Sequence, residues 1–361
     1  MTVAIVRATM DTVDEAMAEA IRLIGYHPEK DAFFIKPNVA DAGPVDQGIL
    51  THPRVVEAFL KLWPERKAVI GESGIVGRDS RVALDRTGYK ALAARLGAEL
   101  VDLEQAERFE APWRDGVIRL PNLVRTHEYV NIAKMKTHVQ AGVTLGMKNQ
   151  KGLLRFPDKK RFHMTGLDAC IRQLSEIVQP ALTIVDGIIA LEGDGPWRFG
   201  TRKDANLLVA GTDMIEVDNV CLRLMGFPPK HAPHIPYREN VTTVGLSIDD
   251  ARTPFVYNYT GYFRYKNVYE HITDSCSGCN WTLYGTLKAV KRSRLRQLRF
   301  LVRGTWRRLD IVMGHGLGDT LPDGHGRVIC VGDCARRYAE KHSLPIARGC
   351  PPDPERVADL L

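Results

Sequence analysis

The sequence predicts an α/β fold with a largely parallel sheet and helices on both of its faces, followed by a small, cysteine-rich, metal-binding domain at the C-terminus. Two observations lead to this prediction. Short apolar segments alternate with segments of helical periodicity as far as about residue 225, which is typical of parallel strands joined by helical crossovers. Beyond about residue 228 prolines and tyrosines become frequent, and all the candidate cysteine ligands follow.

The predicted elements can be placed along the chain. Strands are expected at 3–7, 32–39, 68–72, 100–102, 129–132, 182–185 and 207–210, and helices at 13–24, 53–62, 82–96, 167–177 and 214–224. Right-handed crossovers place the loops that follow parallel strands along one edge of the sheet, where ligands usually bind. We expect a first domain at residues 1–260 and a metal-binding domain at residues 261–361.

Composition narrows the class of protein. The chain has 361 residues, 26% of them charged, and a net charge of +7. No apolar run approaches the roughly 20 residues needed to span a bilayer. The N-terminal segment lacks the basic start and apolar core of a signal peptide, so we expect a cytoplasmic protein. Seven cysteines, an odd number, do not suit a disulfide framework in that compartment.

Four cysteines form a candidate metal site. Cys276 and Cys279 make a C-x-x-C pair, and Cys334 and Cys350 follow, the last directly before Pro351. A cysteine followed by proline closes the cluster motif of bacterial ferredoxins, which favours a [4Fe-4S] cluster. Four thiolates also suit a tetrahedral zinc ion, although a zinc ribbon tends to use two C-x-x-C pairs. Structural zinc therefore stays as the alternative cofactor.

The other three cysteines are expected in the core. Cys330 lies in an apolar run that predicts a buried strand, where a free cysteine behaves as a small hydrophobic residue. Cys170 and Cys221 lie on predicted helices among apolar neighbours. Cys334 is the better ligand candidate than Cys330, because it follows Gly332 and Asp333 at a predicted helix start, where the helix dipole favours a thiolate.

A second candidate site lies in the first domain. Residues 131–154 combine lysines, a histidine and glycines directly after a predicted strand, which suits a phosphate or carboxylate ligand. Glu72, at the end of another strand, is expected to line the same crevice, and Asp186 follows a fourth strand. The candidate anion-binding residues are Lys36, Asn38, Lys134, Lys136, His138, Thr144, Lys148 and Asn149. His138 is the candidate acid or base, because imidazole titrates near neutrality.

Several of these segments resemble the family called domain of unknown function 362. The resemblance is carried by Ile35–Asn38, by the motif Lys134-Met135-Lys136-Thr137-His138, and by the glycine-rich stretch that ends in Lys148 and Asn149. It covers roughly residues 30–225. Many members of that family pair the domain with iron–sulfur ligands, so the resemblance implies a cluster here as well.

The chain is also similar, more distantly, to the lactate racemase family, whose members use a nickel-pincer nucleotide. The run from His138 through Ala141 and Gly142 to Lys148 resembles that family's motif, although asparagine follows the lysine here. The resemblance implies that His138 is a proton-transferring base and that Lys148 is a catalytic, cofactor-linking lysine. It also implies that His163, which by itself reads as a surface residue, is a metal ligand within the cofactor site.

A basic segment lies within the second domain. Nine lysines and arginines fall between Lys288 and Arg308 with no acid among them, and apolar residues recur at helical spacing. The segment is either a solvated helix face or a docking surface for an acidic electron-transfer partner, a nucleic acid or a membrane surface. Nucleic acid is disfavoured, because no recognition module accompanies the charge.

The leading functional hypothesis is a cytoplasmic iron–sulfur oxidoreductase that acts on an anionic small molecule or cofactor. The sequence lacks the G-x-G-x-x-G fingerprint of nicotinamide binding, whereas a flavin or another second cofactor stays open. Two alternatives belong to other classes. One is a non-redox racemase or isomerase whose cysteines hold a structural metal, and the other is a binding or assembly protein whose fold the metal stabilises.

Overall fold

The protein is described here by a computed structural model that covers residues 2–40, 42–75, 79–114, 116–197, 199–257, 263 and 265–361, without the side chains of 277 and 303–305. The chain divides into two compact units. The first unit comprises residues 1–159 and 168–258, and the second comprises 160–167 and 259–361. The sequence boundary was expected at 260, and the contribution of residues 160–167 to the second unit was not anticipated. The α/β fold is confirmed in both units.

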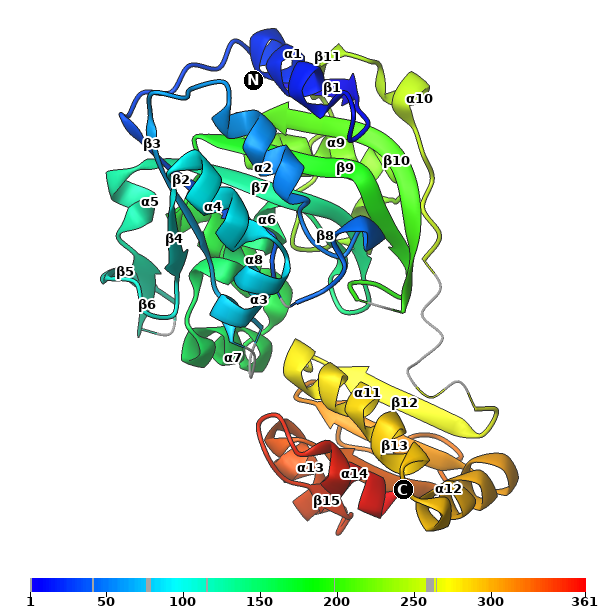
Figure 1. Ribbon diagram of the computed structural model, residues 1–361. Helices are drawn as coiled ribbons and strands as arrows, with labels where there is room; N and C mark the ends of the chain where they lie inside the picture. The colour runs from blue at the N-terminus through cyan, green and yellow to red at the C-terminus, as the bar shows by residue number, and fades with distance from the viewer. Residues whose placement is uncertain are drawn as a thin grey trace. The chain divides into compact units, whose positions relative to one another are not determined.

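The first unit is built on a nine-stranded sheet in which the strand order is β11-β1-β10-β9-β7-β2-β3-β4, with β8 paired to β7 (Figure 1). The strands are β1 (Thr2–Arg7), β2 (Ala32–Pro37), β3 (Lys67–Glu72), β4 (Glu99–Asp102), β7 (Glu128–His138), β8 (Gly142–Thr144), β9 (Leu182–Gly193), β10 (Gly200–Gly211) and β11 (Thr242–Gly245). Neighbouring strands are parallel except where β10 meets β1 and β9 and where β8 meets β7. The sheet is therefore largely parallel, as its crossover helices require.

Helices cover both faces of this sheet. α1 (Val13–Ile24), α2 (Pro53–Leu60), α3 (Ser80–Arg86) and α4 (Tyr89–Leu96) share one hydrophobic core with alternate strand residues such as Phe33, Ile35 and Ile132. α6 (Gly146–Asn149) and α9 (Met214–Leu224) contact each other and strand β9 from the opposite face, and α9 lies behind the sheet in Figure 1. The remaining elements of the first unit are β5 (Arg108–Trp113), β6 (Gly116–Pro121), α5 (Leu123–Thr126), α8 (Leu167–Ile177) and α10 (Ile248–Ala251), and α7 (Phe156–Met164) runs into residues 160–167.

The helix predicted at 82–96 and the strand predicted at 129–132 differ from the structure. The helix expected at 82–96 is two helices, because Gly88 adopts the left-handed conformation (φ 83°) that ends α3 and starts α4. β7 extends to His138 instead of ending at residue 132, so Lys134, Lys136 and His138 lie within the strand and not in the loop after it. The extension is possible because β8 and β9 pair with β7 there and satisfy its backbone.

The second unit contains a parallel sheet of its own, with the order β12-β13-β14-β15. Its elements are β12 (Val268–Thr273), α11 (Ser277–Lys291), α12 (Arg294–Trp306), β13 (Leu309–Gly314), β14 (Arg327–Val331), α13 (Arg336–Lys341), β15 (Ile346–Ala347) and α14 (Pro354–Leu360). α11 and α14 share one core with Ile311 and Met313, whereas α13 packs with Val312 and Cys330 on the other face. This three-layer architecture was not anticipated for the cysteine-rich region.

The basic segment forms the end of α11 and the whole of α12, not one continuous helix. Ser293 separates the two helices and caps α12 by accepting a hydrogen bond from the backbone N–H of Arg296 at 3.4 Å. Within the residues covered here, no helix has both the length and the apolar character needed to cross a membrane.

Candidate functional site

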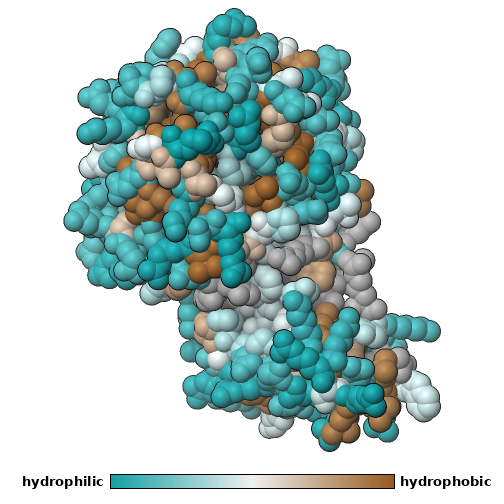
Figure 2. Space-filling view, viewed as in Figure 1, coloured by the Kyte–Doolittle hydropathy of each residue, from teal (hydrophilic) through white to brown (hydrophobic). Residues whose placement is uncertain are grey.

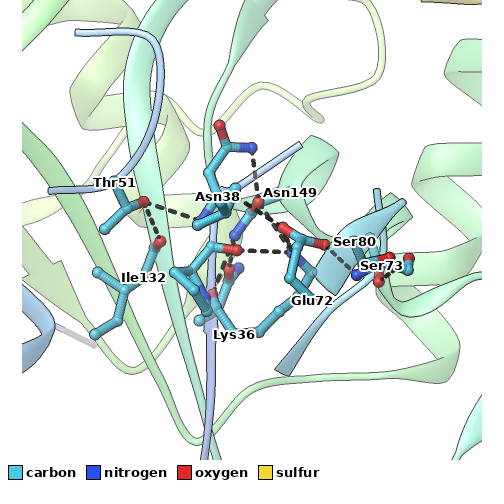
Figure 3. Close-up of polar contacts among 12 residues, drawn as sticks. Lys36, Asn38, Thr51, Glu72, Ser73, Ser80, Ile132 and Asn149 are labelled. Carbon is cyan, nitrogen blue, oxygen red and sulfur yellow. Dashed lines mark hydrogen bonds and ion pairs between the residues drawn. The ribbon is translucent and has the colours of Figure 1, made fainter. Parts of the chain in front are cut away.

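A buried ion pair joins the ends of two neighbouring strands. Lys36 on β2 and Glu72 on β3 are 0% and 2% exposed, and the ammonium Nζ lies 2.8 Å from Oε2 of the carboxylate (Figure 3). Glu72 also accepts backbone N–H bonds from Val39 at 3.0 Å and from Ser73 at 2.9 Å. Burial lowers the pKa of Lys36, and the negative charge of Glu72 offsets part of that effect. The opposite charges of Lys36 and Glu72 therefore cancel within the fold.

Two asparagines connect this pair to a second lysine. Asn149 accepts hydrogen bonds at Oδ1 from Lys36 at 3.3 Å and from Asn38 at 3.0 Å. Asn38 in turn accepts from Nζ of Lys136 at 2.8 Å. Asn131, which lies beside Lys36 in the sheet register, accepts from Nδ2 of Asn149 at 2.8 Å. The predicted residues Lys36, Asn38, Lys136 and Asn149 therefore form one buried hydrogen-bond network.

Lys134 belongs to a second buried ion pair. It lies opposite Asp186 in the pairing of β7 with β9, and its Nζ is 2.8 Å from Oδ2 of that aspartate. Asp186 is further fixed by the backbone N–H of His52 at 2.9 Å and that of Ile188 at 3.2 Å. Burial lowers the pKa of Lys134, and Asp186 opposes the shift. Like Lys36, Lys134 has its charge balanced within the fold.

Lys136 differs from these two lysines because its nearest partners are uncharged. Its ammonium donates to Asn38 and to the backbone carbonyl of Ile49. Burial, followed by the positive charge of Lys134, lowers the pKa of Lys136 to about 7. A lysine with this pKa exchanges its proton near neutral pH, which an ordinary surface lysine does not.

Lys148, like Lys136, has no carboxylate partner among the described residues. It lies on α6, is half-buried, and has no hydrogen bond or ion pair with any residue that the structure describes. Burial lowers the pKa of Lys148 well below the usual range, helped by the charges of Lys151 and Lys136. An unpaired amine in this state is suited to bind an anion or to act as a nucleophile.

Asp218 holds the short helix that carries Lys148. Its two carboxylate oxygens accept the backbone N–H groups of Gly146 at 2.7 Å and of Met147 at 2.8 Å. Gly146 must lack a side chain, because a Cβ there would lie 2.9 Å from Oδ1 of Asp218. Burial raises the pKa of Asp218 to about 7, although the two backbone hydrogen bonds lower it. The sequence analysis assigned no role to Asp218.

The remaining candidates occupy different positions. Thr144 lies opposite Lys136 in the pairing of β7 with β8, and its buried hydroxyl has no hydrogen-bond partner among the described residues. His138 ends β7, and its Nδ1 accepts backbone N–H bonds from Gln140 at 3.2 Å and Ala141 at 3.4 Å. In the neutral ring, Nε2 then carries the proton. His163 is buried within residues 160–167, which belong to the second unit.

The four candidate cysteines of the second unit follow three strands of one parallel sheet. Cys276 follows β12 and caps α11, with Cys279 in the first turn of that helix. Cys334 follows β14, and Cys350 follows β15. Because the carboxyl ends of parallel strands meet at one edge, the three loops come together there. Cys330, in contrast, points into the core on the α13 side of β14, as expected.

The loops approach each other closely around the sulfur atoms. A Cβ added to Gly332 would lie 3.0 Å from Sγ of Cys279, so glycine is required two residues before Cys334. The backbone N–H of Asp333 donates to the carbonyl of Gly349 at 3.0 Å, which joins the Cys334 loop to the Cys350 loop. Thr282 on α11 donates to the carbonyl of Pro352 at 2.8 Å and ties the helix to the same loop.

The electrostatics of the thiols reflect this convergence. The pKa of Cys279 is raised by a hydrogen bond with Cys276, then by burial and by the charges of Cys276, Cys334 and Cys350. Burial, then the charges of Cys276 and Cys350, raise the pKa of Cys334 to about 11. The thiols of Cys279 and Cys334 therefore resist ionisation by themselves, and a bound cation would stabilise their thiolates. Within the described ranges, no group of three or more His, Cys, Asp or Glu side chains is arranged to hold a single metal ion.

Comparison with known proteins identifies a family for the part of the chain that carries the buried lysines. The family model named Domain of unknown function (DUF362) matches residues 34–223, which is more than half of the chain. This protein belongs to the DUF362 family. A curated relative, the thylakoid-associated protein sll1697 of Synechocystis sp. (strain ATCC 27184 / PCC 6803 / Kazusa), is 28% identical over 220 residues. That alignment covers 58% of this chain and 68% of the relative.

The DUF362 match contains the whole lysine network and excludes the four cysteines. It runs from β2 to the end of α9, so it includes both ion pairs, Lys136, Lys148 and the helix-capping Asp218. Asn131 and Asp218 were not selected from the sequence. Strand alternation would not have found Asn131, because it lies three and five positions before Lys134 and Lys136 and therefore on the opposite face of a regular strand.

Proposed function

We propose that this chain is a cytoplasmic DUF362-family iron–sulfur oxidoreductase that acts on an anionic small molecule or cofactor. The observation that carries the proposal is the convergence of Cys276, Cys279, Cys334 and Cys350 from three loops at one sheet edge. A bound [4Fe-4S] cluster would supply single-electron transfer. The N-terminus of α11, a helix of 15 residues, supports an anionic cluster through its dipole.

The first unit supports the binding of an anion. Lys36 and Lys134 are neutralised by Glu72 and Asp186, whereas Lys136 and Lys148 have no carboxylate partner among the described residues. Lys148 is the more exposed of the two and would contact the ligand. Lys136 would hold or release a proton at Nζ, because its pKa is about 7. His138 offers a further proton at Nε2.

The decisive experiment is anaerobic purification of the full chain followed by iron, acid-labile sulfide, zinc and nickel analysis and an optical spectrum. We expect iron and sulfide in equal amounts and a broad charge-transfer absorption that reduction bleaches. Serine at any of the four cysteines should lower the iron content. The matched control variants are Cys170→Ser and Cys221→Ser, two buried helical cysteines that should leave iron unchanged. Stoichiometric zinc without sulfide would refute the redox proposal.

A second candidate function is a racemase or isomerase that uses a cofactor linked to Lys148. The observation in its favour is the lowered pKa of this lysine and the lack of a partner for it within the described residues. Intact-mass and peptide mass spectrometry of the purified chain, together with the nickel analysis, would decide between the two functions. A covalent adduct on Lys148 with bound nickel would favour the racemase, and an unmodified lysine would count against it.

A further inference from the structure

Helix α12 packs through one face and leaves the opposite face uncovered. Phe300 is 2% exposed, and its ring lies 5.6 Å from that of Phe263 and 4.8 Å from that of Tyr265. The large apolar residues on the outer face are Leu295 (57% exposed), Leu298 (61%), Leu301 (46%), Val302 (48%) and Trp306 (85%). In Figure 2, hydrophobic atoms reach the surface of the second unit at the lower right, where Figure 1 draws α12.

These five side chains form a stripe and are not scattered. Residues three and four positions apart share one face of a helix, and Leu295, Leu298 and Val302 have that spacing. Single exposed apolar residues are normal on a soluble protein, whereas a continuous apolar stripe marks a surface that contacts something other than water.

The rim of the stripe is cationic. Arg296 turns toward α14, where it pairs with Asp359 at 2.6 Å and with Glu355. Lys291, Arg294, Arg299 and Arg307 are exposed and make no ion pair with any residue in the described ranges. No acidic residue lies between Lys288 and Arg308. Although Arg292 and Arg296 pair with acids of α14, the exposed apolar face is bordered by further cations that have no ion pair among the described residues.

We propose that α12 docks in the plane of an anionic lipid surface, with its apolar stripe among the outer acyl chains and its arginines at the headgroups. An apolar face with a cationic rim is the combination that holds interfacial helices on anionic bilayers. With 13 residues, α12 lies on the membrane and does not span it. Trp306, at the end of the stripe, is the residue type that prefers the boundary between lipid and water.

The same features of α12 disfavour two other binding partners, a second copy of the chain and an acidic protein. A second copy of the chain, docked symmetrically, would bring two arginine-rich rims together and would incur charge repulsion. An acidic electron-transfer partner would neutralise the arginines but would not require five exposed apolar side chains between them. An anionic bilayer satisfies both the charge and the apolar stripe.

The test is flotation of the full chain with vesicles of phosphatidylcholine, either alone or with about 30 mole percent phosphatidylglycerol. We expect binding to the anionic vesicles only. The charge variant Arg294→Gln/Arg299→Gln should lower the partition coefficient about 30-fold, since each cation contributes about fivefold. The apolar variant Leu295→Ser/Leu298→Ser should lower it about tenfold or more. The control variant Val82→Ser/Val117→Ser, two valines of similar exposure in the first unit, should bind like the parent chain.

Tryptophan emission gives an independent measurement. Vesicle binding should shift the emission to the blue, and Trp306→Phe should abolish the shift while the chain still floats. The proposal is overturned if the parent chain does not bind anionic vesicles, or if the valine control loses binding as much as the leucine variant. It is equally overturned if light scattering shows a dimer that the leucine variant dissociates, or if an acidic protein binds α12 and the leucine variant does not weaken that binding.

Discussion

Separating the two charges of the Lys36–Glu72 pair should destabilise the first unit strongly. Lys36→Met removes the ammonium, but Glu72 keeps its backbone hydrogen bonds from Val39 and Ser73. The result is a buried carboxylate with no positive partner. Glu72→Gln leaves the opposite problem, an ammonium whose remaining acceptors are the carbonyl of Pro37 and the amide oxygen of Asn149.

The magnitude follows from the burial of both groups. Removing one member of a buried pair costs about 3–5 kcal/mol, because the charge left behind is desolvated without compensation. For a unit of about 250 residues, a change of 1 kcal/mol shifts the melting temperature by about 2–4 °C, so each single variant should lower it by about 6–20 °C. The double variant Lys36→Met/Glu72→Gln buries no charge, and its cost should not exceed that of the worse single variant.

Differential scanning calorimetry of the four proteins of this cycle at one pH measures the effect. Arg81→Met is the control, because the Arg81–Asp79 pair is 75% and 43% exposed and should contribute little to stability. If Lys36→Met costs no more than Arg81→Met, or if the two single effects add fully in the double variant, the assignment of Lys36 and Glu72 as a coupled buried pair is incorrect.

Three further predictions use other parts of the same network. The pKa of Lys136 is about 7 in the folded chain and 10.5 as a free side chain, so the unfolded state binds more protons between these values. The free energy of unfolding should therefore rise with pH through this window, by at most about 1.4 kcal/mol per pH unit. Denaturant titrations at several pH values from 7 to 9 should show a smaller rise for Lys136→Met than for the parent chain. Gly152→Ala should lower the free energy of unfolding by about 1–3 kcal/mol, since its Cβ would overlap the Lys36–Glu72 pair and lie 2.5 Å from Nζ of Lys36. Gly318→Ala, with open space around it, should leave this free energy unchanged, and urea titration of both variants measures the difference. Phosphate or a small carboxylate should raise the melting temperature of the parent chain and of the control variant Lys67→Ala, but not that of Lys148→Ala. If the anion raises the melting temperature of Lys148→Ala as much as that of the parent chain, Lys148 is not part of the anion site.

Much of the fold could be predicted from the sequence because its local signals agree with the tertiary structure. The helices at 13–24, 167–177 and 214–224 begin and end where periodicity placed them. The alternation of strands and helices required a parallel sheet, since parallel strands need long crossovers. Cys330 was correctly placed in a buried strand, and Cys170 and Cys221 in buried helices, because apolar neighbours along the chain reflect apolar neighbours in space.

The predictions that were wrong depend on contacts between distant segments. Strand β7 was expected to end before Lys134, because lysines rarely lie in a buried strand. It continues because Asp186, 52 residues away, neutralises Lys134, and because Asn38 and the carbonyl of Ile49 accept from Lys136. No local pattern around residues 132–138 contains that information.

The sequence by itself determined the class of fold and the family, and it predicts which cysteines would bind a metal. Only the tertiary structure decided which lysines are neutralised by carboxylates and which, like Lys136 and Lys148, have no carboxylate partner in the part of the chain that the structure describes. It also decided which face of α12 is exposed. The physical reason is that residue type and spacing govern local conformation, whereas the ionisation and exposure of a side chain depend on groups that the fold brings to it from elsewhere in the chain.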